Sequence, residues 1–265
     1  MYIGCNWSNA LGFLITKEEV NVDYIKTGVY GNFSELFPTM RSKRPILLHG
    51  LGYFEHTGME NIDMIDFDQA NHLIDKCNSP HYGIHLAINN SDMHSGMSDE
   101  EIHKRMSKQI RIFKNKLHVP LLLENIPDSP QDRYKFDHYP YYKPEQITRL
   151  LVENEVSFLL DLTHAKITAQ YHNWNVYEYL RQLPLDLVAE IHVNGSGYDE
   201  ESFPADTHQA MENEDYRLLE WVLNYTNPDI VTLEYNGVGS EDEDIILKSL
   251  KIQLKKINDI CNSVS

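Results

Sequence analysis

Three observations in the sequence predict an α/β fold, a closed (β/α)8 barrel of the TIM type in a single domain. Short apolar segments alternate with longer helical segments, as is typical of a parallel sheet covered by helices. Eight such units fit within 265 residues, close to the ~250 residues of a typical barrel. No G-x-G-x-x-G motif follows the first strand, so an open dinucleotide-binding sheet lacks its fingerprint. The predicted strands cover residues 2–6, 23–27, 45–50, 82–87, 120–125, 157–162, 188–193 and 230–235.

Capping residues and apolar periodicity predict the helices between these strands. Ser98 and Glu101 have the spacing of a capping box, and apolar residues at steps of three and four extend this helix to about residue 117. The last helix is predicted to begin at Ser240 with an acidic first turn. It is predicted to end near the lysines at 255–256, which suit the negative end of the helix dipole.

Composition limits the classes of partner. The chain has 40 acidic and 23 basic residues, a formal net charge of -17, which repels a phosphate backbone and argues against nucleic-acid binding. Its three cysteines are scattered and never form a C-x-x-C pair, which is typical of a reducing compartment. The N-terminal segment has no basic leading region, and no apolar run approaches the length of a membrane span. We therefore expect a cytoplasmic protein without a membrane partner.

Imidazole and carboxylate side chains end six consecutive predicted strands. In a parallel barrel the carboxyl ends of the strands form one rim, where active sites lie. Two further pairs follow closely: Asp161 precedes His164 in a D-x-x-H step, and Asp206 and His208 are two residues apart, so in extended chain they point the same way. The six strand-terminal residues are His49, His85, Glu124, Asp161, His192 and Glu234.

Nine such side chains at one rim predict a metal centre. Carboxylates gathered without cations repel one another and resist ionising together, and the basic residue nearest to these motifs in the sequence is Lys166. Mixed imidazole and carboxylate ligands suit iron, zinc or manganese better than calcium or magnesium. Nine ligands exceed the coordination number of one ion, so we expect two or three ions that share carboxylates. Glu124, at the end of an otherwise apolar strand, is the predicted bridge.

Other residues are given structural interpretations. His103 lies on the helix from residue 98 and His118 lies before the fifth strand, and both are predicted to be at the surface. Cys5 is predicted to be a small buried thiol. The aromatic segment 132–144 follows the fifth strand and is interpreted either as a lid over the substrate or as a self-packed surface loop.

With these residues identified, the sequence resembles a known family. The segments LLHGLGYFE, LLLENIP, FLLDLTHA, AEIHVNGSG and ADTH are similar to those of the multinuclear non-heme iron-dependent oxidative enzymes, which include the methanobactin biosynthesis enzyme. That family lies within the xylose-isomerase-like barrel superfamily, as does endonuclease IV. The resemblance spans residues 45–236. It implies an enzyme that uses iron and dioxygen to oxidise cysteine or nearby backbone in a ribosomally made peptide, often with a leader-binding partner protein.

The resemblance also implies how the ligands are divided among ions. His49, His85 and Glu124 would hold one ion; Glu124, Asp161, His192 and Glu234 a second; His164, Asp206 and His208 a third. One departure is visible: members commonly have a D-x-N-N pattern after the sixth strand, whereas this chain has the D-x-x-H pattern of endonuclease IV.

The sequence leaves other functions open beside iron-dependent oxidation. One is a zinc-dependent phosphodiesterase like endonuclease IV, although the acidic charge disfavours a DNA substrate. Another is a sugar isomerase or epimerase with manganese or magnesium, which needs fewer ligands than this rim supplies. A metal-storage protein is a further alternative.

Overall fold

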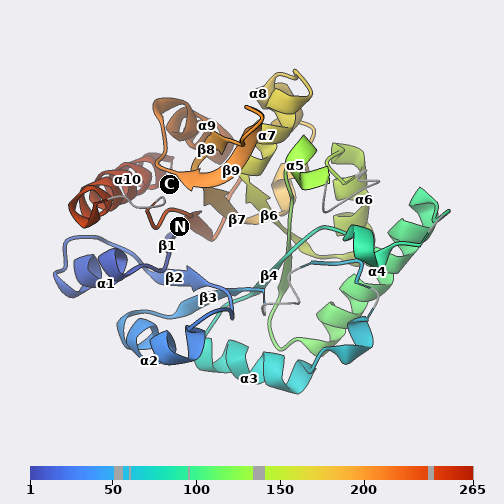
Figure 1. The fold of residues 1–265 in the computed structure, drawn as a ribbon, viewed down its shortest axis with the longest axis horizontal. Coiled ribbons are helices and arrows are strands. Elements are labelled where there is room, and N and C mark those ends of the chain that lie inside the picture. The colour runs from blue at the N-terminus through green and yellow to red at the C-terminus, as the bar shows by residue number, and fades with distance from the viewer. Residues whose placement is uncertain (51–55, 60, 95, 134–140, 238–241, 265) are drawn as a thin grey trace.

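The computed structural model describes residues 1–264 apart from 51–55, 60, 95, 134–140 and 238–241. The barrel strands are β1 (Tyr2–Asn6), β2 (Tyr24–Thr27), β3 (Ile46–His49), β4 (Tyr82–His85), β5 (Leu121–Glu124), β6 (Ser157–Asp161), β7 (Val188–Val193) and β10 (Ile230–Leu233). All eight are parallel to their neighbours and close in the order β1-β10-β7-β6-β5-β4-β3-β2. Helices surround this barrel (Figure 1), which confirms the predicted fold.

The outer layer is formed by helices of very different length. They are α1 (Asn9–Thr16), α2 (Phe33–Lys43), α3 (Phe67–Cys77), α4 (Asp99–Lys116), α5 (Pro130–Arg133), α6 (Pro144–Asn154), α7 (Leu162–Tyr171), α8 (Val176–Leu180), α9 (Asn213–Leu223) and α10 (Glu243–Val264), with short 3-10 turns at Ile62–Met64, Asn90–Asp92 and Leu185–Leu187. Among the described residues no helix is both long enough and apolar enough to cross a membrane.

Two predictions about helix ends have different outcomes. The capping box of α4 is confirmed: the Ser98 hydroxyl accepts from the Glu101 amide, and the Glu101 carboxylate accepts from the Ser98 amide at 2.8 Å. The predicted end of the last helix at 255–256 is wrong, because α10 continues to Val264 and buries Cys261 in its final turns. Its predicted start at Ser240 lies outside the described residues.

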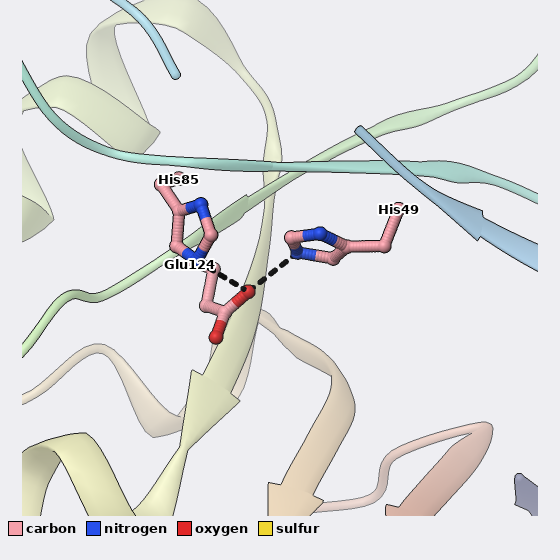
Figure 2. Close-up of side chains that lie close together, drawn as sticks. All are labelled: His49, His85 and Glu124. Carbon is pink, nitrogen blue, oxygen red and sulfur yellow. Dashed lines mark hydrogen bonds and ion pairs between the residues drawn. The ribbon is translucent and has the colours of Figure 1, made fainter. Parts of the chain in front are cut away.

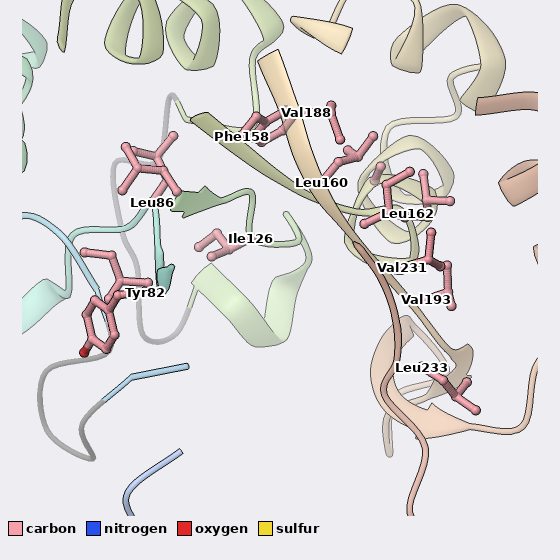
Figure 3. Close-up of a cluster of buried hydrophobic side chains, with 14 of the residues drawn as sticks. Tyr82, Leu86, Ile126, Phe158, Leu160, Leu162, Val188, Val193, Val231 and Leu233 are labelled. Atoms are coloured by element: carbon pink, nitrogen blue, oxygen red, sulfur yellow. The ribbon is translucent and has the colours of Figure 1, made fainter. Parts of the chain in front are cut away.

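The alternation of side chains along each strand separates an apolar shell from a polar interior. Val231 and Leu233 of β10 belong to the buried apolar cluster between the barrel and its helices (Figure 3). Thr232, between them, faces the barrel axis, where its hydroxyl approaches the position that a Cβ would occupy at Gly4. Polar side chains are thereby collected inside the barrel.

A short antiparallel hairpin, which the sequence did not predict, is inserted between β7 and α9. Its strands are β8 (Gly195–Tyr198) and β9 (Pro204–Gln209), and Gly197 lies so close to Thr207 that a Cβ there would lie 2.3 Å from the threonine hydroxyl. β9 carries Asp206 and His208, so the hairpin returns two candidate ligands to the carboxyl end of the barrel.

Candidate metal centre

The strand register brings the predicted ligands to one level of the barrel. β4 pairs with β5 so that His85 lies opposite Glu124, and β6 pairs with β7 so that Asp161 lies opposite His192. Because parallel neighbours end at the same edge, these side chains meet at the carboxyl end of the barrel.

Glu124 lies at the centre of the group and is almost completely buried. Its Oε2 atom lies 2.5 Å from Nε2 of His49 and 3.6 Å from Nε2 of His85 (Figure 2). Its other oxygen, Oε1, lies 3.4 Å from Nδ1 of His164 and 3.5 Å from Nδ1 of His192. Oε2 of this carboxylate therefore faces His49 and His85, whereas Oε1 faces His192, so its two oxygens lie toward different candidate ligands, as a bridging ligand requires.

Two groups of side chains are compact enough to hold a metal ion. Their ligand atoms all lie within 4.8 Å of one another, and they share Glu124. Ligands bound at ~2.1 Å from a single ion lie roughly 3.0–3.4 Å apart, so groups of this size need only small adjustments. The first group is His49, His85 and Glu124, and the second is Glu124, Asp161, His192 and Glu234.

Unpaired polar atoms in the second group fit a cation. Nδ1 of His192 lies 3.5 Å and 3.6 Å from the nearest oxygens of Glu124 and Glu234 and makes no hydrogen bond, although it is buried. Oδ2 of Asp161 is also buried without a hydrogen-bond partner. Buried polar atoms are normally satisfied, so both are suited to binding a metal ion.

The three remaining candidates form a looser cluster around Asp206. His164 donates through Nδ1 to the carbonyl oxygen of Asn125 at 2.7 Å, which directs its Nε2 at Oδ2 of Asp206, 3.1 Å away. Nε2 of His208 lies 3.2 Å from the same oxygen. Among the described residues these three are not one of the groups whose ligand atoms lie within 4.8 Å of one another. All nine predicted side chains therefore lie in one region, but only the first two sets are compact.

Burial and neighbouring charges raise the pKa of some candidate ligands and lower the pKa of others. Burial raises the pKa of Asp161, with further increases from Glu124 and Asp206. Burial also opposes the charge of Glu124, but His85, His192 and His49 outweigh it and hold its pKa well below the usual value. For His49, burial and then the positive charge of Lys26 lower the pKa to about 3. A neutral His49 beside an ionised Glu124 is the state in which both bind metal.

Lys26 lies among the candidate ligands, and the sequence analysis did not place it there. It comes from β2, and its ammonium group forms an ion pair with Glu234. Lys166, the basic residue nearest to the predicted ligands in the sequence, instead pairs with Asp215. Burial lowers the pKa of Lys26, while the surrounding carboxylates, Glu124 first, raise it. Lys26 lines a cavity of about 270 Å³ together with most of the candidate ligands.

Glu190, which the sequence analysis also did not single out, contacts the Nε2 atom of His192. Its Oε1 lies 3.3 Å from Nε2 of His192 and accepts a hydrogen bond from Thr232 at 2.5 Å, and its Oε2 lies 2.5 Å from Nε2 of His81. A carboxylate on one imidazole nitrogen fixes the tautomer, so that the other nitrogen can bind metal. The signal in the sequence was the E-x-H spacing, which places both side chains on one face of β7.

The structural interpretations made from the sequence have mixed outcomes. Cys5 is completely buried and His118 is exposed, as predicted. The prediction for His103 is wrong: only 3% of it is exposed, because α6 covers this side of α4 and Glu153 lies 2.8 Å from its Nε2. Most of the segment 132–144, interpreted as a lid or surface loop, lies outside the described residues.

The fold and the cluster define a class of protein: a TIM barrel with residues that can bind metal at its carboxyl-terminal rim. A putative xylose isomerase from Rhodospirillum rubrum is similar over 98% of this chain and 99% of that chain, with a TM-score of 0.67 and 13% identity. The IolI protein, whose structure holds a zinc atom, is similar over 100% and 98%, with a TM-score of 0.64 and 12% identity. At these identities the likeness shows the fold alone.

The particular family follows from the sequence comparison. The family model of the RiPP precursor modification enzyme MbnB/TglH/ChrH matches residues 15–255, so the chain belongs to this family. A UPF0276 protein of Acaryochloris marina is 28% identical over 179 residues, 64% of this chain and 61% of that protein. A UPF0276 protein of Pseudomonas aeruginosa is 23% identical over 205 residues, 73% and 70% of the two chains. The chain thus spans about three fifths of the first relative's length.

Proposed function

We propose that this chain is an iron-dependent oxidative enzyme that modifies a cysteine-containing, ribosomally made precursor peptide through a multinuclear centre. The observation that carries the proposal is Glu124, which lies between two compact ligand groups that share it. Membership in a family of RiPP precursor modification enzymes supports a peptide substrate. The proposed ligands are His49, His85, Glu124, Asp161, His164, His192, Asp206, His208 and Glu234.

The donor set suits the proposed ions. Imidazole and carboxylate together are ligands of iron, zinc and manganese, and no cysteine is among them. Bound iron would supply the capacity to bind dioxygen and a thiolate and to exchange electrons with them. Two or three such ions would compensate the carboxylates that share the cavity.

The chain's own residues have separate tasks in this proposal. Glu190 orients His192 so that its Nδ1 faces the centre, and the carbonyl oxygen of Asn125 does the same for Nε2 of His164. The cavity of about 270 Å³ has room for a side chain the size of cysteine beside these ligands. Lys26 lines this cavity and provides a positive charge next to Glu234. A leader-binding partner protein would bring the precursor peptide to the rim.

A zinc-dependent phosphodiesterase is a second candidate. It is favoured by His164, which gives this chain the D-x-x-H pattern and places an imidazole 3.1 Å from Asp206. Zinc ions in such a site would activate water for hydrolysis. The acidic net charge of -17 restricts this candidate to small phosphodiesters.

The test compares the two candidates in one preparation. Protein purified without oxygen is loaded with Fe(II) or Zn(II) and mixed with the peptide encoded by a neighbouring short, cysteine-containing reading frame. The proposal predicts oxygen uptake and a change in peptide mass with iron only, both abolished when cysteine in the peptide is replaced by serine. An unchanged peptide, with hydrolysis of bis(4-nitrophenyl) phosphate by the zinc-loaded protein, would instead establish the second candidate.

A further inference from the structure

A second cavity lies beside the candidate metal centre, on the side of the rim formed by β1 and β2. Its volume is about 160 Å³, and it shares part of its wall with the cavity of about 270 Å³ that the candidate ligands line. The shared residues come from the ends of β1 and β2 and from the loop after β2; they are Asn6, Lys26, Thr27 and Tyr30. A peptide with one side chain in the metal centre therefore has a neighbouring side chain within reach of the second cavity.

The buried part of the second cavity is apolar. Phe33, Leu36 and Met40 line it from one face of α2, where they recur at steps of three and four. Phe33 and Met40 are buried, and Leu36 is half-buried. Trp7 also lines the cavity, and its ring packs against Gly12 of α1, where a Cβ would lie 2.6 Å from the ring. These side chains would gain from contact with an apolar group that displaces water.

The mouth of the cavity is polar. Asn32 and Asn236 line it and are exposed, and their amide groups can donate to and accept from a peptide backbone. Tyr30 borders both cavities, and its ring packs against Gly28 so closely that a Cβ there would clash with it. An apolar lining with a few polar groups at the entrance is typical of a binding site that takes up one side chain and orients the backbone outside.

The volume indicates the size of the side chain. An apolar cavity of about 150 Å³ engineered into another protein takes up benzene, so a cavity of about 160 Å³ suits a group as large as the side chain of leucine or phenylalanine. A charged side chain would lose its hydration among Phe33, Leu36 and Met40 without gaining a partner from them.

We propose that the second cavity is a specificity site, which binds an apolar side chain of the substrate peptide within two residues of the cysteine that enters the metal centre. The inference rests on the proposed function, because it takes the substrate to be a peptide. It adds the chemical class of a second residue that the enzyme recognises.

The first test is a titration of the full-length protein with N-acetyl-leucine amide, followed by ligand-observed NMR. This compound is expected to bind 10–100-fold more tightly than N-acetyl-alanine amide, since the cavity buries its larger side chain. Leu36→Trp fills the cavity and is expected to remove this preference. Leu73→Trp is the matched control and is expected to keep it, because Leu73 is also a half-buried leucine packed against the core but lies on α3, outside the lining of both cavities.

Two results of this titration would overturn the proposal. One is equal binding of the leucine and alanine compounds to the unchanged protein. The other is an undiminished preference in folded Leu36→Trp, because the leucine compound would then bind elsewhere. If this variant does not fold, as judged by circular dichroism, Leu36→Phe takes its place and is judged in the same way.

The second test separates the specificity site from the oxidative function. Residues within two positions of the cysteine in the precursor peptide are replaced by alanine one at a time, and oxidation by the iron-loaded protein is measured. Replacing the apolar residue that enters the cavity is expected to lower kcat/KM 10–100-fold. Equal kcat/KM for all of these peptides would overturn the specificity site and leave the oxidative function standing. Binding of the leucine compound as expected, with an unmodified precursor peptide, would refute the oxidative function alone.

Discussion

Replacing Glu124 with glutamine tests whether one carboxylate serves both compact ligand groups. Glutamine keeps the size of the side chain but removes the charge that faces His49 and His85 on one side and His164 and His192 on the other. If Glu124 bridges, both ions lose a ligand in the same variant.

The magnitude follows from linkage between metal binding and unfolding. At a free ion concentration of 1,000 times Kd, each ion stabilises the fold by about 4 kcal/mol. In a chain of this size 1 kcal/mol corresponds to ~2 °C in Tm. Two bound ions are therefore expected to raise the Tm of the unchanged protein by ~16 °C over the metal-free form, and one bound ion by ~8 °C.

The assay is thermal unfolding with and without Co(II), followed by circular dichroism, together with elemental analysis of bound metal. Glu124→Gln is expected to lose both ions and most of the metal-dependent shift in Tm. Glu153→Gln is the control, because it alters a carboxylate that also contacts a buried imidazole, His103, but lies outside the cavity. Retention of one ion and of half the shift by Glu124→Gln would refute the bridge.

Two further predictions concern the surroundings of the ligands. Glu190→Gln removes the carboxylate that orients His192, so the affinity of the ion bound by His192 is expected to fall 10–100-fold, as measured by Co(II) titration; an unchanged affinity would show that Glu190 has no positioning role. Asp206→Asn tests a pH dependence in metal-free protein. Burial opposes the charge on both Asp206 and His164, but hydrogen bonds from the imidazoles hold the pKa of Asp206 well below its usual value, and Asp161 and Asp206 raise the pKa of His164 well above its usual value. The Asp206 carboxylate stabilises the fold above about pH 4, and this stabilisation is lost as pH falls through its lowered pKa. The charged His164 stabilises the fold below about pH 6.5, and this stabilisation is lost as pH rises through its raised pKa. Between about pH 4 and pH 6.5 the free energy of unfolding of Asp206→Asn should therefore be lower by about 2 kcal/mol, or ~4 °C in Tm, than that of the unchanged protein, and the difference should be smaller at pH 9. An equal difference in both pH ranges would contradict an ion pair between Asp206 and His164.

The barrel could be predicted because buried parallel strands have a strong local signal. All eight predicted barrel strands exist, and their ends differ from the observed ends by at most two residues. The β8–β9 hairpin could not be predicted in this way, since Gly195 and Gly197 give its first strand little β propensity and no apolar alternation. Its pairing depends on contacts with the barrel that the local sequence does not contain.

The candidate site was predictable to the extent that its residues end strands. His85 and Glu124 were placed together because parallel strands end at one edge. Lys26 was missed since a lysine within a short strand is normally assigned to the surface, and nothing near it in sequence reveals Glu234, 208 residues away. His103 was assigned to the surface for a related reason: its burial depends on the packing of α6 against α4, which lies beyond the reach of helical periodicity.

The most direct test of the account is a crystal structure of protein purified without oxygen and loaded with Fe(II), with anomalous diffraction recorded at the iron edge. We predict an iron peak beside each oxygen of Glu124, with the Lys26 ammonium group next to Glu234. A fully metallated crystal with a single peak, or with only water among these side chains, would contradict it.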